Sequence, residues 1–556
     1  MASPHIRPTF GYRRSADQDA AAPVRHPVVL VGAGPAGLSV AIDLALQHVP
    51  VVLLDDDDTV SGGSRAVCYA KRTLEVWDRL GVGDAVVADG VGWRRGWVHH
   101  GDRLVYEFDL MTEAGHKMPA FTNLQQYLLE EALVARARQL AGLDLRWRNR
   151  LISMRAAADH VALRVDTPDG PYDLECQWLV ATDGARSLVR RLFDLEFIGQ
   201  TVRDRFLICD VETDAAFPNL RHFWFDPPFH RERVVLLHRQ AANLWRIDFQ
   251  LGWYADPAAE QQPERVAMRL RRILGERAEF RVEAAEVYTF QCRRLERFVH
   301  GRVVFAGDAA HQVSPFGARG ANSGVQDADN LAWKLRLVLA GLAPAALLES
   351  YDRERVAAAD ENLCYAARAA EFISPRSPMT RALRDAALHL AGRFSFARDF
   401  INSGRLSEPA VYTESLLTTP DDPADRFAGG VIPGAACLDA PVERQGQVDW
   451  LLHQLGFDFV ALVFAGEQAP PSDQVAQLAA LPVPVRTVVV RTAAAAAVDA
   501  GGLADTEGLA RDRYDGRPGT TYLVRPDQHV AARWRRFDPA AITVALARAT
   551  GLQAAA

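Results

Sequence analysis

The first clear pattern along the chain is a pair of hydrophobic runs that flank a glycine-rich turn. Residues 27–31 (PVVLV) and 50–55 (PVVLLD) are almost continuously apolar, and residues 38–46 between them carry apolar side chains at helical spacing. Continuous apolar runs of this length are typical of strands buried on both faces of a parallel sheet. The pattern therefore predicts a strand, a turn, a helix and a second strand. Residues 177–181 and 302–306 predict two further buried strands.

A different pattern occupies residues 200–255, where short aromatic-rich runs are separated by turn signals such as DPPFH. Together these runs predict an antiparallel sheet inserted into the chain. The predicted strands are Arg205–Asp210, His222–Phe225, Arg233–His238 and Leu244–Leu251. Along the last strand, side chains alternate between two faces. One face carries Arg246, Asp248 and Gln250, the other Trp245, Ile247 and Phe249. Which face would meet a ligand is open at this point.

Composition is that of an ordinary globular protein. Of the 556 residues, 49% are hydrophobic and 24% are charged, and the net charge is −7. An acidic balance gives no general attraction for nucleic acid or an anionic membrane, so we expect neither as a partner. The six cysteines are widely spaced, with no CxxC pair and no ligand spacing with histidine. We therefore expect no disulfide framework, no metal site and a cytoplasmic location.

The turn after the first strand predicts a dinucleotide site. It comprises Gly32, Ala33, Gly34, Pro35, Ala36 and Gly37. In such a turn the first glycine permits the tight bend, the second lets the backbone approach a pyrophosphate, and the third lets helix pack against strand. Asp55 ends the next strand 18 residues after Gly37, where a carboxylate would accept hydrogen bonds from a ribose. The alternative is a turn whose glycines serve packing only.

Two later segments extend this prediction to a flavin. ATDGARS carries Asp183 after one buried strand, and AGDAAH carries Gly307 and Asp308 after another. A carboxylate at Asp308 could bind the hydroxyls of a ribityl chain. The loop that follows, PFGARGAN, would let backbone amides approach a flat ring, and a helix N-terminus near Gly320–Asn322 would favour negative charge there. The alternatives are a helix N-cap role for Asp308 and a simple turn at Asp183.

In this order and spacing, the three segments resemble the class A flavoprotein aromatic hydroxylases, which are single-component FAD monooxygenases, over about residues 27–400. The resemblance implies that the ADP half of FAD is held by Gly32, Gly34, Gly37 and Asp55, and the ribityl chain by Asp308. It places Pro315 beside the reactive edge of the flavin and Gly320, Ala321 and Asn322 at its pyrimidine side. Further positions that contact the flavin in the family correspond to Arg65, Gln126 and Asp183.

The resemblance also implies the fold: α/β, with a Rossmann-like FAD-binding domain, an inserted antiparallel substrate sheet and a thioredoxin-like α/β C-terminal domain. The expected units are an arm (1–26), the FAD-binding domain (27–199 and 293–417), the substrate sheet (200–292), a linker (418–434) and the C-terminal domain (435–556). Without a CxxC pair, the last domain is expected to serve packing or oligomerisation, with a homodimer as one possible state. We expect removal of residues 430–556 to leave flavin binding intact.

The activity implied by the resemblance is hydroxylation of a phenolic or other electron-rich aromatic with NAD(P)H and O2. NAD(P)H would reduce FAD, O2 would add at C4a, and the hydroperoxide would transfer OH to the ring. For contact with the substrate hydroxyl, Tyr288 is the first candidate and Arg246 the second. Arg319 stands where many relatives have glutamine, and it could bind substrate or nicotinamide or pair with a carboxylate. Further substrate candidates are His222, Phe225, His238, Asp248 and Gln250. Any of these could instead be a core aromatic or part of an ion pair.

Three other hypotheses stay open. A hydroxylase of polycyclic polyketides would need a wide cavity between the inserted sheet and the flavin, whereas a monocyclic substrate would need a small closed one. A flavin reductase or dehydrogenase would not insert oxygen. A flavin-binding interaction protein would use the C-terminal domain for docking. A single GxGxxG between strand and helix argues against a second dinucleotide domain, so NADH or NADPH is expected to bind transiently.

Overall fold

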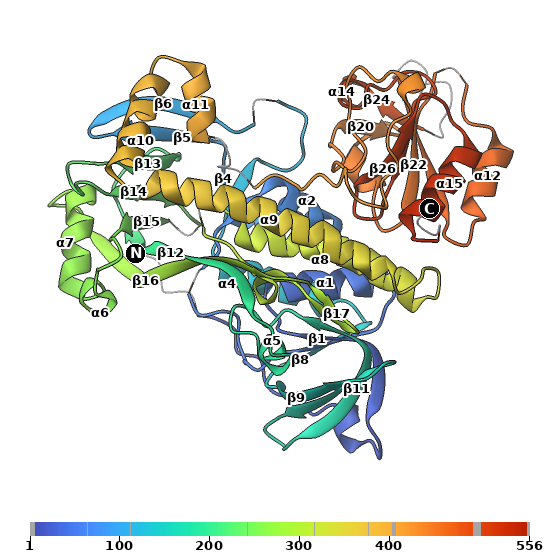
Figure 1. Ribbon diagram of the computed structural model, residues 1–556, viewed down its shortest axis with the longest axis horizontal. Coiled ribbons are helices and arrows are strands. Elements are labelled where there is room, and N and C mark those ends of the chain that lie inside the picture. Colours follow the sequence, from blue (N-terminus) through green and yellow to red (C-terminus); the bar gives the residue numbers. More distant parts are fainter. Residues whose placement is uncertain are drawn as a thin grey trace.

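The computed structural model describes residues 6–552, apart from residues 64, 112, 242, 316, 376, 403–406, 467 and 493–501. Within these residues the strands form four sheets, which makes the chain a mixed α/β protein (Figure 1). The smallest sheet contains β3 (Cys68–Ala70), β4 (Val91–Trp93) and β7 (Phe121–Asn123). No helix in the described part of the chain is both long and apolar enough to cross a membrane.

The first large sheet contains the glycine-rich turn. β1 (Val24–Val31) and β2 (Val51–Leu54) pair in parallel and are joined by α1 (Pro35–Leu46), as the apolar runs predict. β11 (Tyr172–Ala181) lies parallel on the other side of β1, with β18 (Val303–Phe305) beyond it. The other strands of this sheet are β8 (Leu143–Arg146), β9 (Arg150–Ala156), β10 (Val161–Asp166) and β17 (Val299–His300). The carboxyl ends of the parallel strands β1, β2, β11 and β18 therefore meet at one edge of the sheet.

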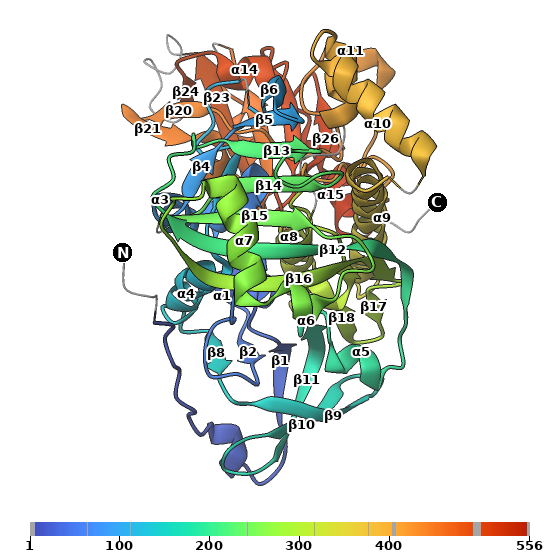
Figure 2. The ribbon, with the colours of Figure 1, turned by 90° about the vertical axis from the view of Figure 1, so that its left-hand side faces the viewer.

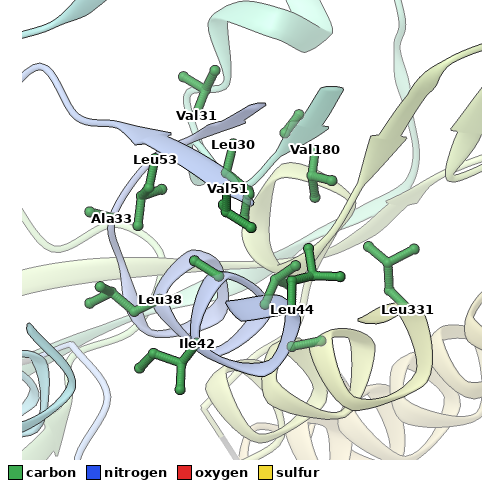
Figure 3. Close-up of a cluster of buried hydrophobic side chains, with 14 of the residues drawn as sticks. Leu30, Val31, Ala33, Leu38, Ile42, Leu44, Val51, Leu53, Val180 and Leu331 are labelled. Atoms are coloured by element: carbon green, nitrogen blue, oxygen red, sulfur yellow. The ribbon is translucent and has the colours of Figure 1, made fainter. Parts of the chain in front are cut away.

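Apolar side chains of α1 hold that helix against the sheet (Figure 3). Leu38, Ile42 and Leu44 are fully buried in one cluster with Leu30 of β1 and Leu53 of β2. Burial of each such side chain stabilises the fold by about 1.5–3 kcal/mol. This packing fixes the N-terminus of α1 at the edge of the sheet where the parallel strands end.

The second large sheet is the antiparallel layer predicted from the aromatic-rich runs. Its strands, in spatial order, are β19 (His311–Gln312), β16 (Phe280–Leu295), β12 (Phe197–Thr213), β15 (Leu244–Gln250), β14 (Val234–Arg239), β13 (Arg221–Phe225), β5 (Arg95–His100) and β6 (Arg103–Asp109). All neighbours pair antiparallel except β13 and β5, which are parallel. The sheet thus includes two strands from residues 95–109, well before the inserted segment, which the sequence analysis did not detect.

The two faces of this sheet differ in what covers them. Trp245, Ile247 and Phe249 pack beneath α7 (Pro263–Leu274), which crosses the outer face (Figure 2). The opposite face, which carries Phe206 and Phe225, packs against α9 (Leu347–Ile373) and α10 (Pro378–Ala391). The alternation along β15 places Arg246, Asp248 and Gln250 on this inner face. The structure therefore resolves which face is turned toward the interior.

Two long helices connect the parts of the molecule. α8 (Gly320–Leu339) and α9 run side by side from the antiparallel sheet to the C-terminal region (Figure 1). After α9 the chain forms α10 and α11 (Ser395–Asn402) above the inner face of the antiparallel sheet. The helices that flank the first sheet are α2 (Lys71–Arg79), α3 (Gly83–Asp89), α4 (Gln126–Ala137) and α5 (Leu188–Leu192).

The C-terminal region forms its own mixed sheet. Its strands, in spatial order, are β21 (Gln447–Trp450), β20 (Pro441–Arg444), β24 (Leu503–Asp505), β23 (Val485–Thr492), β22 (Phe459–Phe464), β25 (Thr521–Val524) and β26 (Val530–Trp534). The helices of this region include α12 (Ser472–Ala479), α14 (Leu509–Arg513) and α15 (Pro539–Ala549). Ile542 and Leu546 of α15 pack on Phe459 and Leu523 of the sheet, which gives this region a hydrophobic core.

The N-terminal residues lie along the edge of the first sheet. The Phe10 ring stacks on Trp147 with ring centroids 4.5 Å apart, and Asp17 forms an ion pair with Arg146 at 2.7 Å. The Phe10 amide also donates to the carbonyl oxygen of Asp58, in the loop that follows Asp55. The arm is therefore attached to the domain from Phe10 onward.

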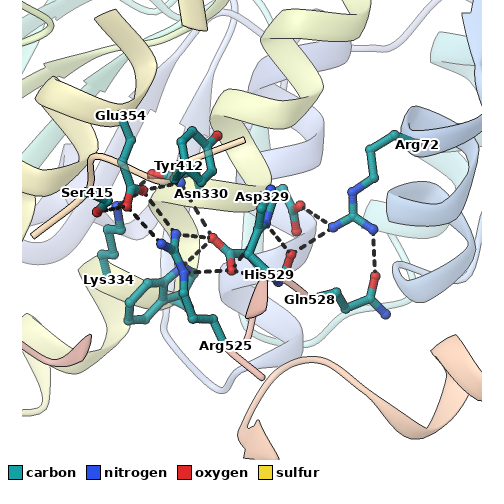
Figure 4. A network of polar contacts seen from close by, with 12 residues as sticks. Arg72, Asp329, Asn330, Lys334, Glu354, Tyr412, Ser415, Arg525, Gln528 and His529 are labelled. Atoms are coloured by element: carbon teal, nitrogen blue, oxygen red, sulfur yellow. Dashed lines mark hydrogen bonds and ion pairs between the residues drawn. The ribbon is translucent and has the colours of Figure 1, made fainter. Parts of the chain in front are cut away.

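A buried network of charges joins the C-terminal sheet to the long helices (Figure 4). The Arg525 guanidinium donates to Glu354 of α9 at 2.8 and 3.0 Å and to Asp527 at 2.6 Å. Lys334 of α8 pairs with Glu354 at 2.7 Å. All four side chains are buried, and the two cations hold the pKa of the Glu354 carboxyl well below its usual range.

This network changes the expectation that the C-terminal region is separable. Removal of residues 430–556 would leave Glu354 without Arg525 and Arg72 of α2 without its bonds to Asp527 and Gln528. Because a buried charge without its partner is strongly destabilising, such a truncation should impair folding of the flavin-binding part as well.

We predict that Arg525→Met lowers the free energy of unfolding by about 3–5 kcal/mol, because it leaves Glu354 and Asp527 undercompensated in the interior. Urea denaturation of the purified full-length protein measures this change. The control is Arg164→Ala, which removes the exposed pair between Arg164 and Asp173 and should cost less than about 1 kcal/mol. Equal effects of the two substitutions would contradict the prediction.

Candidate active site

The three glycines of the turn after β1 have different surroundings. Gly32 has φ +102°, and a Cβ there would lie 2.5 Å from the Thr182 carbonyl oxygen; a Cβ on Gly37 would overlap the Gly32 carbonyl oxygen. Both glycines are therefore required by packing. A Cβ on Gly34, by contrast, would meet no atom within 4 Å. The backbone at Gly34, just before the N-terminus of α1, thus faces open space, as a pyrophosphate site requires.

The other residues of the turn complete this edge. Pro35 and Ala36 form the first turn of α1, and the Ala36 methyl lies 3.0 Å from the position of a Cβ on Gly307. Asp55 accepts hydrogen bonds from the Ala33 amide at 2.6 Å and the Asp57 amide at 2.9 Å. Burial raises the pKa of Asp55 to about 6. The carboxylate is therefore fixed beside the glycine turn.

Two further carboxylates lie at the ends of β11 and β18. Asp183 accepts from the Leu188 amide through Oδ2 at 2.7 Å, and its buried Oδ1 has no partner among the described residues. The Asp308 side chain is accessible, although the protein around it raises its pKa. Carboxylate oxygens without a hydrogen-bond partner, at the edge of a sheet, are suited to accept hydrogen bonds from a ligand with several hydroxyl groups.

The loop after β18 leads into the N-terminus of α8. Pro315 is exposed in a turn, and Gly320 begins the helix. The amides of a first helical turn have no acceptor within the helix, so those of Gly320, Ala321 and Asn322 are available to a ligand. The Asn322 side chain is already engaged: it accepts from the Ala70 amide at 2.9 Å and donates to the Cys68 carbonyl oxygen at 3.0 Å. It therefore fixes β3 to α8.

Arg65 and Gln126 border the same region. Arg65 is exposed in the loop before β3, and its positive charge acts to lower the pKa of Asp308, against the net rise. Gln126, the first residue of α4, accepts from the Ala66 amide at 3.0 Å and donates to Glu130 at 2.8 Å. It thereby holds the loop that carries Arg65.

His311 supports this loop from inside. Its ring hydrogen bonds to Asp327 of α8 at 2.6 Å, and Asp327 also pairs with Arg355 of α9 at 2.6 Å. The Gly307 amide donates to the same carboxylate at 2.9 Å. His311 and Arg355 hold the pKa of Asp327 well below its ordinary value. The segment around Asp308 is thus held by a buried ion-pair network.

A cavity of about 540 Å³ lies between the inner face of the antiparallel sheet and α9 to α11, and it reaches the loop residues Gly317 and Ala318. Aromatic side chains from the sheet and from α9 dominate its wall. Its lining includes Trp93, Phe108, Leu110, Phe121, Arg221, Phe223, Phe225, Leu236, Arg368, Glu371, Phe372, Ile373, Leu383, Arg384 and Ile401. Its polar side chains are few, which is typical of a site for an aromatic ligand.

Of the substrate residues proposed from the sequence, Phe225 lines this cavity. Arg246 and Asp248 lie on the same sheet face, but Arg246 is bound to Asp210 by two hydrogen bonds of 2.7 and 2.8 Å. Burial raises the pKa of Asp248 to about 6. His238, also on this face, is 3% exposed, and neither ring nitrogen has a partner among the described residues. Gln250 is buried and accepts from the Val234 amide at 2.9 Å.

The remaining candidates lie outside the cavity lining. His222 is on the outer face of the sheet, where its ring stacks on Trp224 with centroids 5.1 Å apart. Tyr288 is half-buried and donates to Glu286, and burial raises its pKa to about 12. Arg319 is buried against α9, where it donates to Asn362 at 2.7 Å and lies over the Tyr365 ring. None of these three residues is among those that line the cavity.

Several cavity residues were missed by the sequence analysis, above all Trp93, Arg221 and Phe223 of the sheets and Phe372 of α9. A signal for two of them was present in residues 221–225 (RHFWF), where alternation places Arg221, Phe223 and Phe225 on one face. Trp93 and Phe372 come from segments far away in the sequence, and no local pattern could join them to this site.

The edge with Gly34 and Asp308 and the adjoining aromatic cavity define a flavoprotein that acts on a small aromatic molecule. A model of the FAD-binding domain family matches residues 25–366. The chain belongs to this family, that of the FAD-dependent aromatic monooxygenases. It is accordingly a flavoenzyme with FAD as its cofactor and NAD(P)H as the co-substrate typical of the family, which confirms the resemblance found in the sequence.

Two relatives illustrate the range of the family. A 3-(3-hydroxy-phenyl)propionate/3-hydroxycinnamic acid hydroxylase of Mycolicibacterium smegmatis is 30% identical over 404 residues, 71% of each chain. A 6-methylpretetramide 4-monooxygenase of Streptomyces rimosus is 29% identical over 547 residues, 93% of this chain and 92% of its own. The second similarity thus includes the C-terminal region.

The fold is also similar to that of a solved aklavinone-11 hydroxylase in a ternary complex with FAD and aklavinone. The sequences are 27% identical, the TM-score is 0.75, and the similarity covers 95% of this chain and 99% of the other. The arrangement of sheets and helices described above is therefore that of a known flavin-dependent hydroxylase over nearly its whole length.

We predict that Gly34→Val abolishes tight FAD binding without disturbing the fold. Gly34 has φ −76° in the extended region, so valine fits the backbone, yet its side chain would fill the open space at the helix N-terminus. Loss of two charge-assisted hydrogen bonds of about 1.5 kcal/mol each would weaken FAD binding about 100-fold. Reconstitution of apoprotein followed by flavin fluorescence measures this. Gly37→Val, the control, should fail to fold; unchanged FAD affinity in Gly34→Val would contradict the assignment.

We also predict that Asp308→Ala weakens FAD binding by about 10- to 100-fold, because a charge-assisted hydrogen bond contributes about 1.5–3 kcal/mol. The protein should stay folded, since Asp308 has no hydrogen-bond partner among the described residues. Retention of flavin through gel filtration, read from visible absorbance, checks this outcome. Asp308→Asn keeps the hydrogen-bonding capacity and should retain more flavin. A fully flavin-loaded Asp308→Ala protein would refute this role.

Proposed function

We propose that the protein hydroxylates a polycyclic phenolic aromatic, with electrons from NAD(P)H and an oxygen atom from O2. The observation that carries this proposal is the cavity of about 540 Å³ between the sheet and α9 to α11. An apolar cavity of about 150 Å³ is enough to hold benzene. The observed cavity therefore has room for several fused rings, and it suits the wider of the two substrate classes considered from the sequence.

The surroundings of the cavity support the same substrate class. Trp93, Phe121 and Phe223 line the cavity from the sheets and Phe372 lines it from α9, and aromatic side chains favour stacked or edge-on contacts with ligand rings. The similarity over most of the chain to a 6-methylpretetramide 4-monooxygenase and to aklavinone-11 hydroxylase points in the same direction. The second candidate, a phenylpropanoid as substrate, is favoured by the relative from Mycolicibacterium smegmatis.

The residues at the edge of the first sheet have the chemistry to hold FAD. We assign the open space before α1, at Gly34, to the pyrophosphate, Asp55 to the adenosine ribose and Asp308 to the ribityl hydroxyls. The amides of Gly320, Ala321 and Asn322 would meet the pyrimidine edge, with Pro315 beside the reactive edge. Gln126 would act by holding the loop of Arg65. FAD, when bound, supplies hydride acceptance from NAD(P)H and the activation of O2.

The protein itself would orient the ring and exclude water. α9, α10 and α11 close the cavity opposite the sheet, so that their apolar side chains shield the reacting region. Arg246 is bound to Asp210, so it would have a structural role on the inner face of the sheet and would not bind the substrate hydroxyl directly. Tyr288 would border the flavin end of the same face. We further propose that the first sheet is a Rossmann-like unit and the C-terminal region a thioredoxin-like domain without thiol chemistry.

The proposal predicts that polycyclic phenols such as hydroxylated anthraquinones stimulate NAD(P)H oxidation by the FAD-loaded protein more than phenol or a hydroxyphenylpropionate does. With 18O-labelled O2, one labelled oxygen should appear in the product, which mass spectrometry detects. Stimulation without label in any product would support a reductase and contradict a hydroxylase. Stimulation by single-ring phenols alone would contradict the polycyclic class but leave a hydroxylase.

A further inference from the structure

We propose that Arg221 is an anion anchor of the aromatic cavity, so that the protein selects polycyclic ligands that carry an ionised oxygen. The ligand class is an aromatic ring system with a phenolate, an enolate or a carboxylate. This inference rests on the proposed function because it concerns the same cavity. It adds the charge of the substrate, a property that the size of the cavity does not determine.

Arg221 is held inside the cavity by aromatic rings. It is the first residue of β13, and its guanidinium lies 5.3 Å from the ring centroid of Trp93 and 5.4 Å from that of Phe223. Both rings also line the cavity. Contacts with ring faces attract a cation electrostatically and so favour this placement of the guanidinium. The side chain is therefore presented to the cavity in a defined orientation rather than extended into solvent.

Arg221 has no ion-pair partner among the described residues, although its charge acts on buried Asp248 of the same face, where it opposes the rise in pKa that burial causes. Its Nη1 donates to the Cys68 sulfur at 3.0 Å, and its buried Nε has no hydrogen-bond partner among the described residues. Among the described residues, no carboxylate lies at ion-pair distance from Arg221. Arg246 on the same sheet face, by contrast, is paired with Asp210 at 2.7 Å. A half-buried guanidinium without a counterion is unfavourable. An anionic ligand would supply the missing partner.

The other cations of the cavity differ from Arg221 in this respect. Arg384 of α10 is paired with Asp385 at 2.9 Å, and Arg368 of α9 is exposed. The cavity lining thus contains three arginines and one acidic residue, Glu371. This excess of positive charge in the lining favours an anionic ligand. Because Arg384 is paired and Arg368 is exposed, Arg221 is the arginine that would contact the anion inside the cavity.

Arg221 lies near the end of the cavity that faces the flavin loop. Its sulfur partner belongs to Cys68, and the Cys68 carbonyl oxygen accepts from Asn322 in the first turn of α8. One residue therefore connects the guanidinium to the helix N-terminus assigned to the flavin. A guanidinium can bind a delocalised oxyanion through two parallel hydrogen bonds, so an ionised oxygen held there would fix the position of the ring that carries it.

The test compares ligands that differ in charge but hardly in shape, with FAD-loaded protein at pH 8.5. One pair is 2-hydroxyanthraquinone and its methyl ether; the second is anthraquinone-2-carboxylate and its methyl ester. Binding is followed by the change in flavin absorbance. Because hydrogen bonds to charged groups contribute about 1.5–3 kcal/mol, wild-type protein should prefer the ionised member of at least one pair by about 10- to 100-fold. The pair that shows the preference identifies a phenolate or a carboxylate.

Variants separate charge from shape. Arg221→Gln should abolish the preference by weakening the ionised ligand about 10- to 100-fold and the neutral one less than about threefold. Arg221→Lys keeps the charge and should retain part of the preference. Arg368→Gln, a substitution of an exposed arginine that also lines the cavity, is the matched control and should leave it intact. Flavin content and thermal stability are measured for each variant. If Arg221→Gln is unstable, the reduced preference of Arg221→Lys for the ionised ligand, relative to wild-type protein, is used instead.

Three results would overturn the inference: no preference for the ionised ligand in wild-type protein, equal weakening of both ligands by Arg221→Gln, or the same loss in Arg368→Gln. These outcomes are distinct from failure of the proposed function. If neutral polycyclic phenol ethers bind as well as ionised ligands and labelled oxygen still enters a polycyclic product, the hydroxylase stands and Arg221 is not its anchor. If no polycyclic ligand binds or reacts, both proposals fall.

Discussion

The structure depends most on a line of buried ion pairs along α8 and α9. Two neighbouring residues of α9 face two different partners: Glu354 binds Arg525 of the C-terminal region, and Arg355 binds Asp327 of α8. Asp327 in turn holds His311 and the Gly307 amide, which fix the loop with Asp308. Since such charges are tolerated in the interior only with all partners present, the C-terminal sheet, the long helices and the cofactor edge are energetically one unit.

The same helix α9 also reaches the substrate cavity. At about 1.5 Å per residue its 27 residues span about 40 Å, with the ion pairs near its start, contacts to Arg319 from Asn362 and Tyr365 in its middle, and Phe372 at its end. The wall of the cavity is therefore part of the element that is fixed by the buried charges. The C-terminal region thus has a clear physical role, namely to supply Arg525 and Asp527 to that network.

The sequence was most informative where structure is local. The strands and helix around Gly32, Gly34 and Gly37 follow from hydrophobic periodicity, and the different surroundings of these glycines agree with the roles expected from a tight turn. It was least informative where contacts are distant. Arg72 meets Gln528 across 456 positions of the chain, and β5 joins β13 in a sheet of which only four strands were predicted, all from a later segment. Pattern analysis ranks residues by their neighbours in sequence and cannot detect such pairs.

The substrate residues show the same limit at the level of single side chains. Alternation correctly grouped Arg246, Asp248 and Gln250 on one face, but a polar residue on the inner face of a sheet has two possible fates: it pairs within the sheet or it faces the cavity. Arg246 has Asp210 directly opposite on β12 and is satisfied there. Arg221 also lies on this face, but among the described residues it has no carboxylate within ion-pair distance, and aromatic rings hold it toward the cavity. Only the register of four strands distinguishes these two arginines, and this register depends on strand pairings that no single segment encodes. Cross-strand pairing therefore decides which of these two arginines is bound within the sheet and which is turned toward the cavity.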